Sequence, residues 1–177
     1  MMGLVALGTH FSINHNALMG SRFYLGCFVG LVIASLGGTA SALAAGIPGR
    51  ERLEIVGVGI AAFGLFAGAL ACVIGMQSLG VSANPAQDVM CFEKGAFLSL
   101  LPAGVILSFL VRGWTARPFR AALIALLGSG ALGALIVHLS CGFLAPKHLI
   151  LGHLSVPIVL MVLGVYPVAV LLKRLRK

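Results

Sequence analysis

The sequence has little charge: only 9% of its 177 residues are Asp, Glu, Lys or Arg, and only four of these are acidic. Soluble domains carry about a quarter charged residues, so a chain of this size could not cover a water-exposed surface with so few. Aromatic residues are also scarce, at 7%, whereas 60% of the chain is hydrophobic. These proportions exclude an ordinary soluble domain and indicate that lipid forms part of the solvent.

The sequence also lacks the short motifs that mark common zinc and redox sites, because it contains no C-x-x-C and no H-x-x-x-H. Charged residues are nearly absent from its apolar runs, which excludes an intramembrane proton relay or a midplane ion site. We therefore expect no enzymatic activity. The net charge of +8 would suggest a nucleic-acid partner in a soluble protein, but here the basic residues stand beside apolar runs. In that position they signal membrane topology, so we expect no nucleic-acid binding.

Five apolar runs are long enough to cross a membrane, since a helix needs about 17 to 25 residues to do so. Helices are expected because lipid offers no partner to open backbone groups, and the runs are continuous rather than alternating. The sequence therefore predicts an all-α, polytopic transmembrane bundle in which residues 1–177 form one domain. The predicted spans are residues 23–47, 53–79, 95–111 (the shortest), 119–139 and 149–172.

Polar stretches separate the predicted spans. Residues 80–94 are predicted to form a loop, because they contain Asn84, Pro85, Gln87 and Asp88. A basic turn around Trp114 follows the third span, and residues 141–148 link the last two spans.

Basic residues gather at one end of the predicted spans. Two lie in the 48–52 loop, three in the 112–120 turn and four in the C-terminal tail, against three at the opposite ends. Because Lys and Arg are retained in the cytoplasm, the turn that holds Arg112, Arg117 and Arg120 is predicted to be cytoplasmic. The C-terminus is predicted to lie on the same side.

The reactive side chains fall on the opposite face. Cys91 precedes the third span and Cys141 follows the fourth, while His138, His148 and His153 flank the next loop. Thiolate and imidazole together suit zinc or copper, so a heavy-metal ion could bind here. Two cysteines that face an oxidising compartment could instead form a disulfide, or remain unpaired thiols at a helix boundary. Two further histidines before the first span fall on this face: His10 and His15.

Small residues are frequent inside the predicted helices, and glycine alone occurs 24 times. Two G-x-x-x-G spacings begin at Gly26 and Gly64, and such faces let membrane helices approach closely. We expect them to pack within a monomeric bundle, with dimerisation as the alternative. Cys27 and Cys72 lie in mid-helix apolar runs and are interpreted as small, inert hydrophobic residues.

Three stretches of the second half of the chain resemble the NrsF-type family of bacterial membrane anti-sigma factors. The first is CFEKGAFLSLLPAGVILSFLVRGWTARP, in which Cys91 precedes a proline-containing helix and an Arg-rich turn that ends in proline. The second is GALGALIVHLSC, a glycine-rich helix that ends in Cys141. The third is the step of twelve residues from Cys141 to His153, which matches a family histidine early in the last helix. The resemblance covers roughly residues 90–177.

This resemblance implies an inner-membrane protein that holds an extracytoplasmic-function sigma factor. Cys91 and Cys141 would form an outer-face pair that responds to heavy metal or oxidation and causes the sigma factor to be released. Family members usually have six spans and a cytoplasmic N-terminal segment. Residues 1–9 are interpreted as the end of a sixth span. Ser140 stands where the family has a histidine beside the second cysteine, with His138 nearby.

Two other classes of protein fit the same residues. A membrane thiol-redox or metal-handling protein would use the same Cys and His side chains, although redox proteins of that kind usually carry a C-x-x-C pair. A small structural or assembly subunit would need no site. A sensor built on Cys91 and Cys141 requires the two residues to lie close together on one membrane face, since a disulfide needs Cα atoms within about 7 Å.

Overall fold

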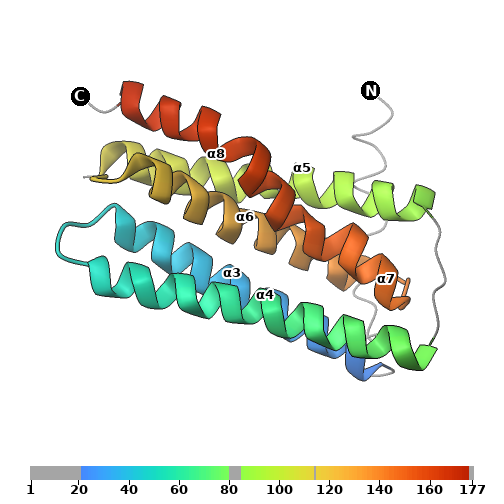
Figure 1. The fold of residues 1–177 in the computed structure, drawn as a ribbon. Coiled ribbons are helices and arrows are strands. Elements are labelled where there is room, and N and C mark those ends of the chain that lie inside the picture. The colour runs from blue at the N-terminus through green and yellow to red at the C-terminus, as the bar shows by residue number, and fades with distance from the viewer. Residues whose placement is uncertain (1–20, 80–84, 114, 176–177) are drawn as a thin grey trace.

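The described part of the chain, residues 21–79, 85–113 and 115–175 of a computed structural model, is a bundle of helices without strands (Figure 1). Five of these helical runs are long and apolar enough to cross a membrane, which confirms the predicted all-α transmembrane class. They are α3 (Arg22–Ala45), α4 (Glu51–Leu79), α5 (Pro85–Arg112), α6 (Pro118–Ser140) and a continuous run of α7 (Pro146–His148), η1 (Leu149–Leu154) and α8 (Ser155–Leu175).

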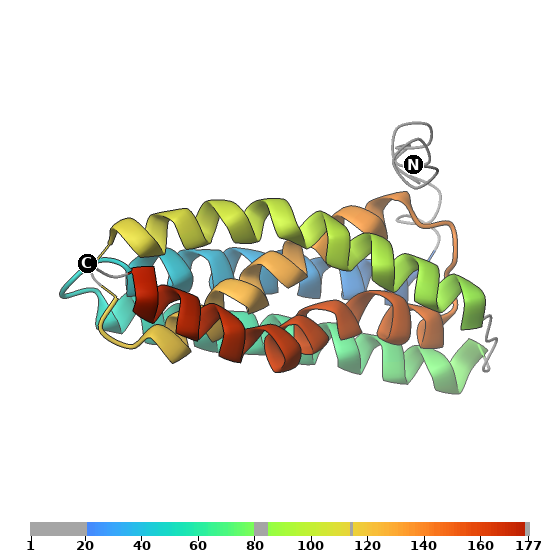
Figure 2. The ribbon, with the colours of Figure 1, turned by 90° about the horizontal axis from the view of Figure 1, so that it is seen from above.

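The helices lie along one long axis, and α6 occupies the centre of the bundle (Figures 1 and 2). In α6, 72% of the span is buried, against 22–28% in α4, α5 and the α7–α8 run. Helix α6 contacts α3, α5 and α8 directly, whereas α4 packs mainly on α3. The apolar faces of the outer helices therefore remain available to lipid.

Glycines allow the helices to touch backbone to backbone. A Cβ atom at Gly30 would lie 2.6 Å from the carbonyl oxygen of Gly64 in α4. A Cβ atom at Gly38 would lie 2.6 Å from the Cα of Gly128 in α6. No real side chain tolerates such contacts, so these positions explain why the close-approach pattern of glycines occurs in the sequence.

Helix α5 begins earlier than the sequence predicts. Residues 85–94, predicted as loop, form its first turns, and its 28 residues make it longer than α3 or α6 rather than the shortest span. Pro85 suits the first helical position, where no N–H is needed, and Asp88 lies in the first turn, where the helix dipole favours a carboxylate. The last two spans are likewise joined by residues 141–145 alone, because α7 starts at Pro146. Asn84 lies outside the described residues.

The two ends of the bundle differ in chemistry. One end holds the α3–α4 connection, the α5–α6 turn and the C-terminal end of α8 (Figure 1), and with them Arg112, Arg117 and Arg120. There Nε of Arg120 pairs with Oε1 of Glu54 at 2.5 Å, which joins α6 to α4. The other end holds the cysteines and histidines described below. The cytoplasmic placement of the basic end remains a prediction.

Some predicted features lie outside the described residues: Trp114, the sixth span in residues 1–9 and the tail residues 176–177.

The hydrophobic core follows the same division. Near the end where α3 begins, buried residues of α3, α4, α6 and the α7–α8 run form one cluster that includes Leu31, Leu149 and Val156. Near the basic end, α3, α5, α6 and α8 form a second cluster that includes Leu110 and Ile124.

Candidate metal centre

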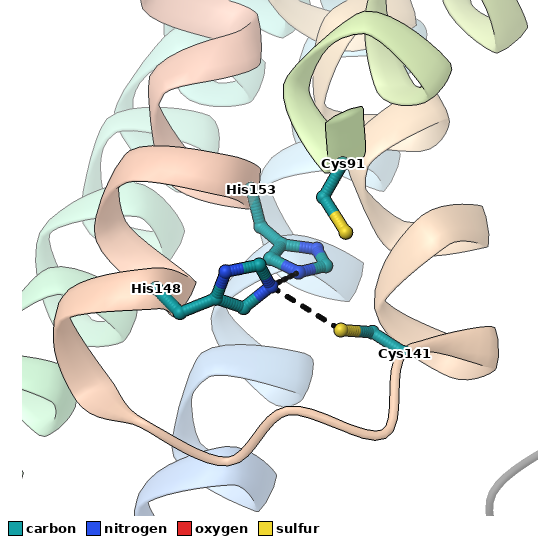
Figure 3. A group of neighbouring side chains, drawn as sticks. All are labelled: Cys91, Cys141, His148 and His153. Atoms are coloured by element: carbon teal, nitrogen blue, oxygen red, sulfur yellow. Dashed lines mark hydrogen bonds between the residues drawn. The ribbon is translucent and has the colours of Figure 1, made fainter. Parts of the chain in front are cut away.

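Four buried side chains with metal-binding atoms meet at the end of the bundle opposite the basic turns: Cys91, Cys141, His148 and His153 (Figure 3). One ligand atom from each, either a sulfur or a ring nitrogen, lies within 4.8 Å of all the others. None of the four residues is more than 7% exposed. Cys91 lies in α5, Cys141 directly follows α6, His148 ends α7 and His153 lies in η1. The site therefore joins parts of the chain that are far apart in sequence.

The distances between these atoms fit a four-coordinate metal ion. Nε2 of His148 lies 3.3 Å from Sγ of Cys141 and 3.4 Å from Nε2 of His153 (dashed in Figure 3). Tetrahedral zinc with bonds of about 2.0–2.3 Å separates neighbouring ligand atoms by about 3.3–3.8 Å. Two thiolates and two imidazoles form a common structural zinc set and also suit other soft metal ions.

His148 and His153 share the site because a π-helical turn lies between them. On an α-helix, residues five positions apart point about 140° away from each other. In η1 the hydrogen bonds are wider, as shown by the N–H of Ser155 donating to the carbonyl of Ile150, so five residues complete little more than one turn. The spacing H-x-x-x-x-H thus does here what H-x-x-x-H does on an α-helix. Such turns are rare and frequently lie at functional sites.

Gly152 leaves the room in which these side chains meet. A Cβ atom at this position would lie 3.2 Å from Cε1 of His148 and 3.3 Å from Cβ of Cys91. Both contacts are tighter than ordinary van der Waals packing. The glycine therefore lets α5 approach η1 closely enough for Cys91 to reach the two imidazoles.

The surroundings of Cys141 favour its thiolate form. Hydrogen bonding from the Cys91 thiol is the main cause that lowers the pKa of Cys141, with smaller effects from the Phe143 N–H and the charge of Lys94, while burial opposes the shift. The Phe143 N–H donates to Sγ of Cys141 at 3.4 Å. The thiolate is the form that binds metals, so these contacts suit the Cys141 sulfur to ligation.

Asp88 joins the candidate site, although its place in the sequence did not predict this. Nδ1 of His148 donates to Oδ1 of Asp88 at 2.6 Å, and both side chains are buried. This bond places the proton on Nδ1 and leaves Nε2 free to bind a metal, an arrangement typical of zinc-binding histidines. The available signal was its position three residues before Cys91, which puts both on one helix face, but the segment was predicted to be a loop.

His138, predicted as a possible metal ligand, is not one of the four grouped ligands. Its Nε2 lies 3.1 Å from the carbonyl oxygen of Tyr24, and its ring stacks on the Tyr24 ring with centroids 3.9 Å apart. The Tyr24 hydroxyl in turn contacts the carbonyls of His138 and Cys141. His138 therefore joins α6 to α3 beside the site, since its Nε2 is used by the Tyr24 carbonyl.

The other predicted residues fall outside the ligand group. Cys27 and Cys72 are fully buried members of one hydrophobic cluster with Tyr24, which fits the packing role expected of them. All four cysteines are free thiols. The arginines Arg112, Arg117 and Arg120 lie at the opposite end of the bundle (Figure 1). His10 and His15 are not among the described residues.

Comparison of the chain with models of protein families, with curated proteins and with solved structures finds no match. The site itself therefore indicates what this chain can do. Four protein ligands would complete a tetrahedral ion and leave no position for water or substrate, as in structural rather than catalytic metal sites. The arrangement suits the binding of a metal ion, or the formation of a disulfide between Cys91 and Cys141.

Proposed function

We propose that this protein is a bacterial inner-membrane anti-sigma factor whose Cys/His site detects a thiophilic metal ion or an oxidant. The observation that supports detection is the convergence of four buried ligand atoms within 4.8 Å, at the end of a membrane bundle opposite its basic turns. The resemblance of residues 90–177 to the NrsF-type family supplies the partner, an extracytoplasmic-function sigma factor held at the basic end.

Metal binding would connect three helices at one point. Cys91 belongs to α5, Cys141 to the end of α6, and His153 to the run that continues as α8. The far ends of the same helices carry the basic residues that would face the sigma factor. Since packed helices move as stiff elements, a change in spacing at the site alters the arrangement at the basic end. Release of the sigma factor follows from that rearrangement.

An oxidant would act on the same two thiols. Cys91 and Cys141 have sulfur atoms within 4.8 Å, so a small movement allows an S–S bond. In that step the two thiols lose two protons and give two electrons to an oxidant such as hydrogen peroxide, which is reduced to water. The disulfide removes two of the four metal ligands. The same two cysteines would therefore respond to both the metal and the oxidant.

A metal-handling protein is the second candidate. The set of four ligands supports metal binding by such a protein as well as by an anti-sigma factor. It differs from the first candidate in needing no cytoplasmic partner. A site closed by four buried ligands suits retention of an ion better than transfer, because transfer requires an open coordination position. This supports regulation over transport.

The test is retention of a sigma factor by the full-length protein. The tagged chain is purified from its host membranes in mild detergent, with and without cadmium chloride or hydrogen peroxide, and co-purifying proteins are identified by mass spectrometry. We expect one extracytoplasmic-function sigma factor in the untreated sample and its loss after either treatment. A variant with Cys91→Ser and Cys141→Ser should keep the sigma factor throughout. The matched control, Cys27→Ser with Cys72→Ser, should respond like the unmodified protein.

Two results would contradict the proposal. If no sigma factor is retained although the protein binds cadmium with its four ligands, the metal-handling function is correct instead. If the response survives substitution of both Cys91 and Cys141, the site does not detect either stimulus.

A further inference from the structure

Among the described residues, only one of the two candidate histidine ligands has an outer hydrogen-bond partner. His148 donates from Nδ1 to Asp88, whereas Nδ1 of His153 is buried and has no hydrogen-bond partner among the described residues. When Nε2 of a neutral histidine binds a metal, Nδ1 carries the proton and almost always donates it to an acceptor. A buried donor without an acceptor costs about 1–3 kcal/mol, so His153 requires a partner once metal is bound.

A second unpaired nitrogen lies next to it. Nδ1 of His138 is also buried and makes no hydrogen bond within the described ranges. Its other nitrogen, Nε2, lies 3.1 Å from the Tyr24 carbonyl oxygen, and a carbonyl can only accept. The proton of His138 is therefore on Nε2, which leaves Nδ1 as a bare acceptor. The two unpaired atoms are thus complementary: His153 needs an acceptor and His138 offers one.

The rings are close enough to pair. The centroids of His138 and His153 lie 5.2 Å apart, with the rings nearly perpendicular at 86°. His148 and His153 show the same centroid separation of 5.2 Å, and their Nε2 atoms are 3.4 Å apart. Two imidazoles at this centroid separation can therefore bring ring nitrogens within hydrogen-bond reach, as His148 and His153 do. Pairing of the two Nδ1 atoms needs a turn of the His153 ring while His138 keeps its contact with Tyr24. Both side chains are fully buried, so bulk water does not compete.

We propose that His138 is the positioning residue of His153: its Nδ1 accepts the Nδ1–H of His153 when Nε2 of His153 holds the metal. This inference rests on the metal site of the proposed function. It produces one continuous line of hydrogen bonds that runs from the metal through His153 and His138 to the Tyr24 carbonyl. Helix α3, which supplies none of the four ligands, is thereby tied to the occupancy of the site.

The test uses Co²⁺ as the probe, because its absorption reports both affinity and tetrahedral geometry. The full chain in detergent micelles is compared with His138→Phe, which keeps a ring on Tyr24 but has no nitrogen, and with His138→Gln, which keeps an acceptor and a donor. We expect His138→Phe to lose about 10–100-fold in Co²⁺ affinity and His138→Gln to recover most of that loss. A second readout is the ¹⁵N NMR signal of His153 in the zinc-loaded protein, which should show a hydrogen-bonded Nδ1–H that is absent in His138→Phe.

The possible failures are distinguishable. If His138→Phe binds Co²⁺ as tightly as the unmodified chain, with an unchanged His153 signal, the role of His138 is wrong and the metal site stands. If His138→Gln loses as much affinity as His138→Phe, a hydrogen-bond acceptor at this position does not restore binding, and the inference is also wrong. If the unmodified chain binds no Co²⁺, the metal site of the proposed function fails, and the role of His138 fails with it.

Discussion

At the level of single residues, the candidate site depends on groups that fix the orientation of its ligands. The His148 imidazole is held by the Asp88 carboxylate at 2.6 Å, and the Cys141 sulfur accepts the Phe143 N–H. Such outer contacts decide which atom of a side chain points at a metal. The candidate ligands are therefore arranged without an ion, which would lower the cost of ordering them on metal binding.

The substitution Asp88→Asn tests this arrangement. Asparagine keeps the size of the side chain but removes its charge, so His148 becomes a weaker ligand. We expect zinc affinity to fall by about 10–100-fold, measured by competition with a coloured chelator. The control is Glu93→Gln, which changes an exposed carboxylate on the same helix and should leave affinity unchanged. Equal affinity of Asp88→Asn and the unmodified chain would show that Asp88 serves packing alone.

The sequence identified most of the site residues but not their roles. Cys91, Cys141 and the histidines stand out because few other reactive groups lie near the ends of the apolar runs. Position along the chain cannot distinguish a ligand from its neighbour, and His138, three residues before Cys141, is turned toward Tyr24 of α3. Asp88 was missed because polar composition suggested a loop, although a helix can extend beyond the hydrocarbon region with polar first turns.

At the level of elements, the π-turn η1 sets the spacing of the histidine pair. The sequence contains no H-x-x-x-H, which indicates that a helical metal motif is lacking. That reasoning assumed α-helical geometry, in which residues five apart diverge by about 140°. Neither composition nor apolar periodicity reveals a single wide turn inside a continuous hydrophobic run, so the relation of His148 to His153 could not be predicted.

Deletion of Leu151 provides an unusual test of this turn. Leu151 is exposed, and its removal converts the spacing to H-x-x-x-H while the segment returns to α-helical hydrogen bonding. Since residues four apart share one face of an α-helix, we expect zinc binding to be retained. Insertion of an alanine after Leu151 should abolish it, because the histidines then lie six residues apart. Both variants are measured by the same competition titration, and loss of binding on deletion would contradict the role assigned to the turn.

Close helix contact depends on particular glycines rather than on glycine content. A Cβ atom at Gly64 would lie 2.6 Å from both the Ala34 nitrogen and the Gly30 oxygen, whereas one at Gly59 in the same helix meets nothing within 4 Å. We expect Gly64→Ala to lower the free energy of unfolding by about 1–3 kcal/mol through overpacking. Gly59→Ala should have no destabilising effect. Unfolding in mixed micelles of increasing denaturing detergent measures both, and equal stability would show that α3 and α4 can separate without cost.

At the level of the whole molecule, the number and class of the spans followed from the sequence alone. Lipid leaves an apolar run no alternative to a helix, so all five spans were located, and the first, second and fourth helices begin and end within two residues of their predicted limits. The order of helices around α6 could not be predicted, because every run is apolar on most of its faces. The meeting of Asp88 with His148 depends on that order.

The orientation of the molecule is predicted from its Lys and Arg residues and can be measured directly. In a chain whose four cysteines are replaced by serine, single cysteines are introduced as Gly142→Cys and Arg174→Cys, both at exposed positions at opposite ends. We expect a membrane-impermeant maleimide to label Gly142→Cys in intact cells and Arg174→Cys only after permeabilisation. The reverse pattern would place the Cys/His site in the cytoplasm and contradict detection of outer stimuli.

The backbone contact between α3 and α4 has a mechanical consequence. No side chain separates the backbones at Gly30 and Gly64, so we expect α3 and α4 to move as one unit. Two polar contacts join this pair of helices to α6. Glu54 pairs with Arg120 at one end, and Tyr24 contacts His138 at the other. Between them, the backbone of Gly38 touches that of Gly128. We expect that loss of either polar contact lets the α3–α4 pair tilt about the contact of Gly38 with Gly128, which loads the polar contact that remains.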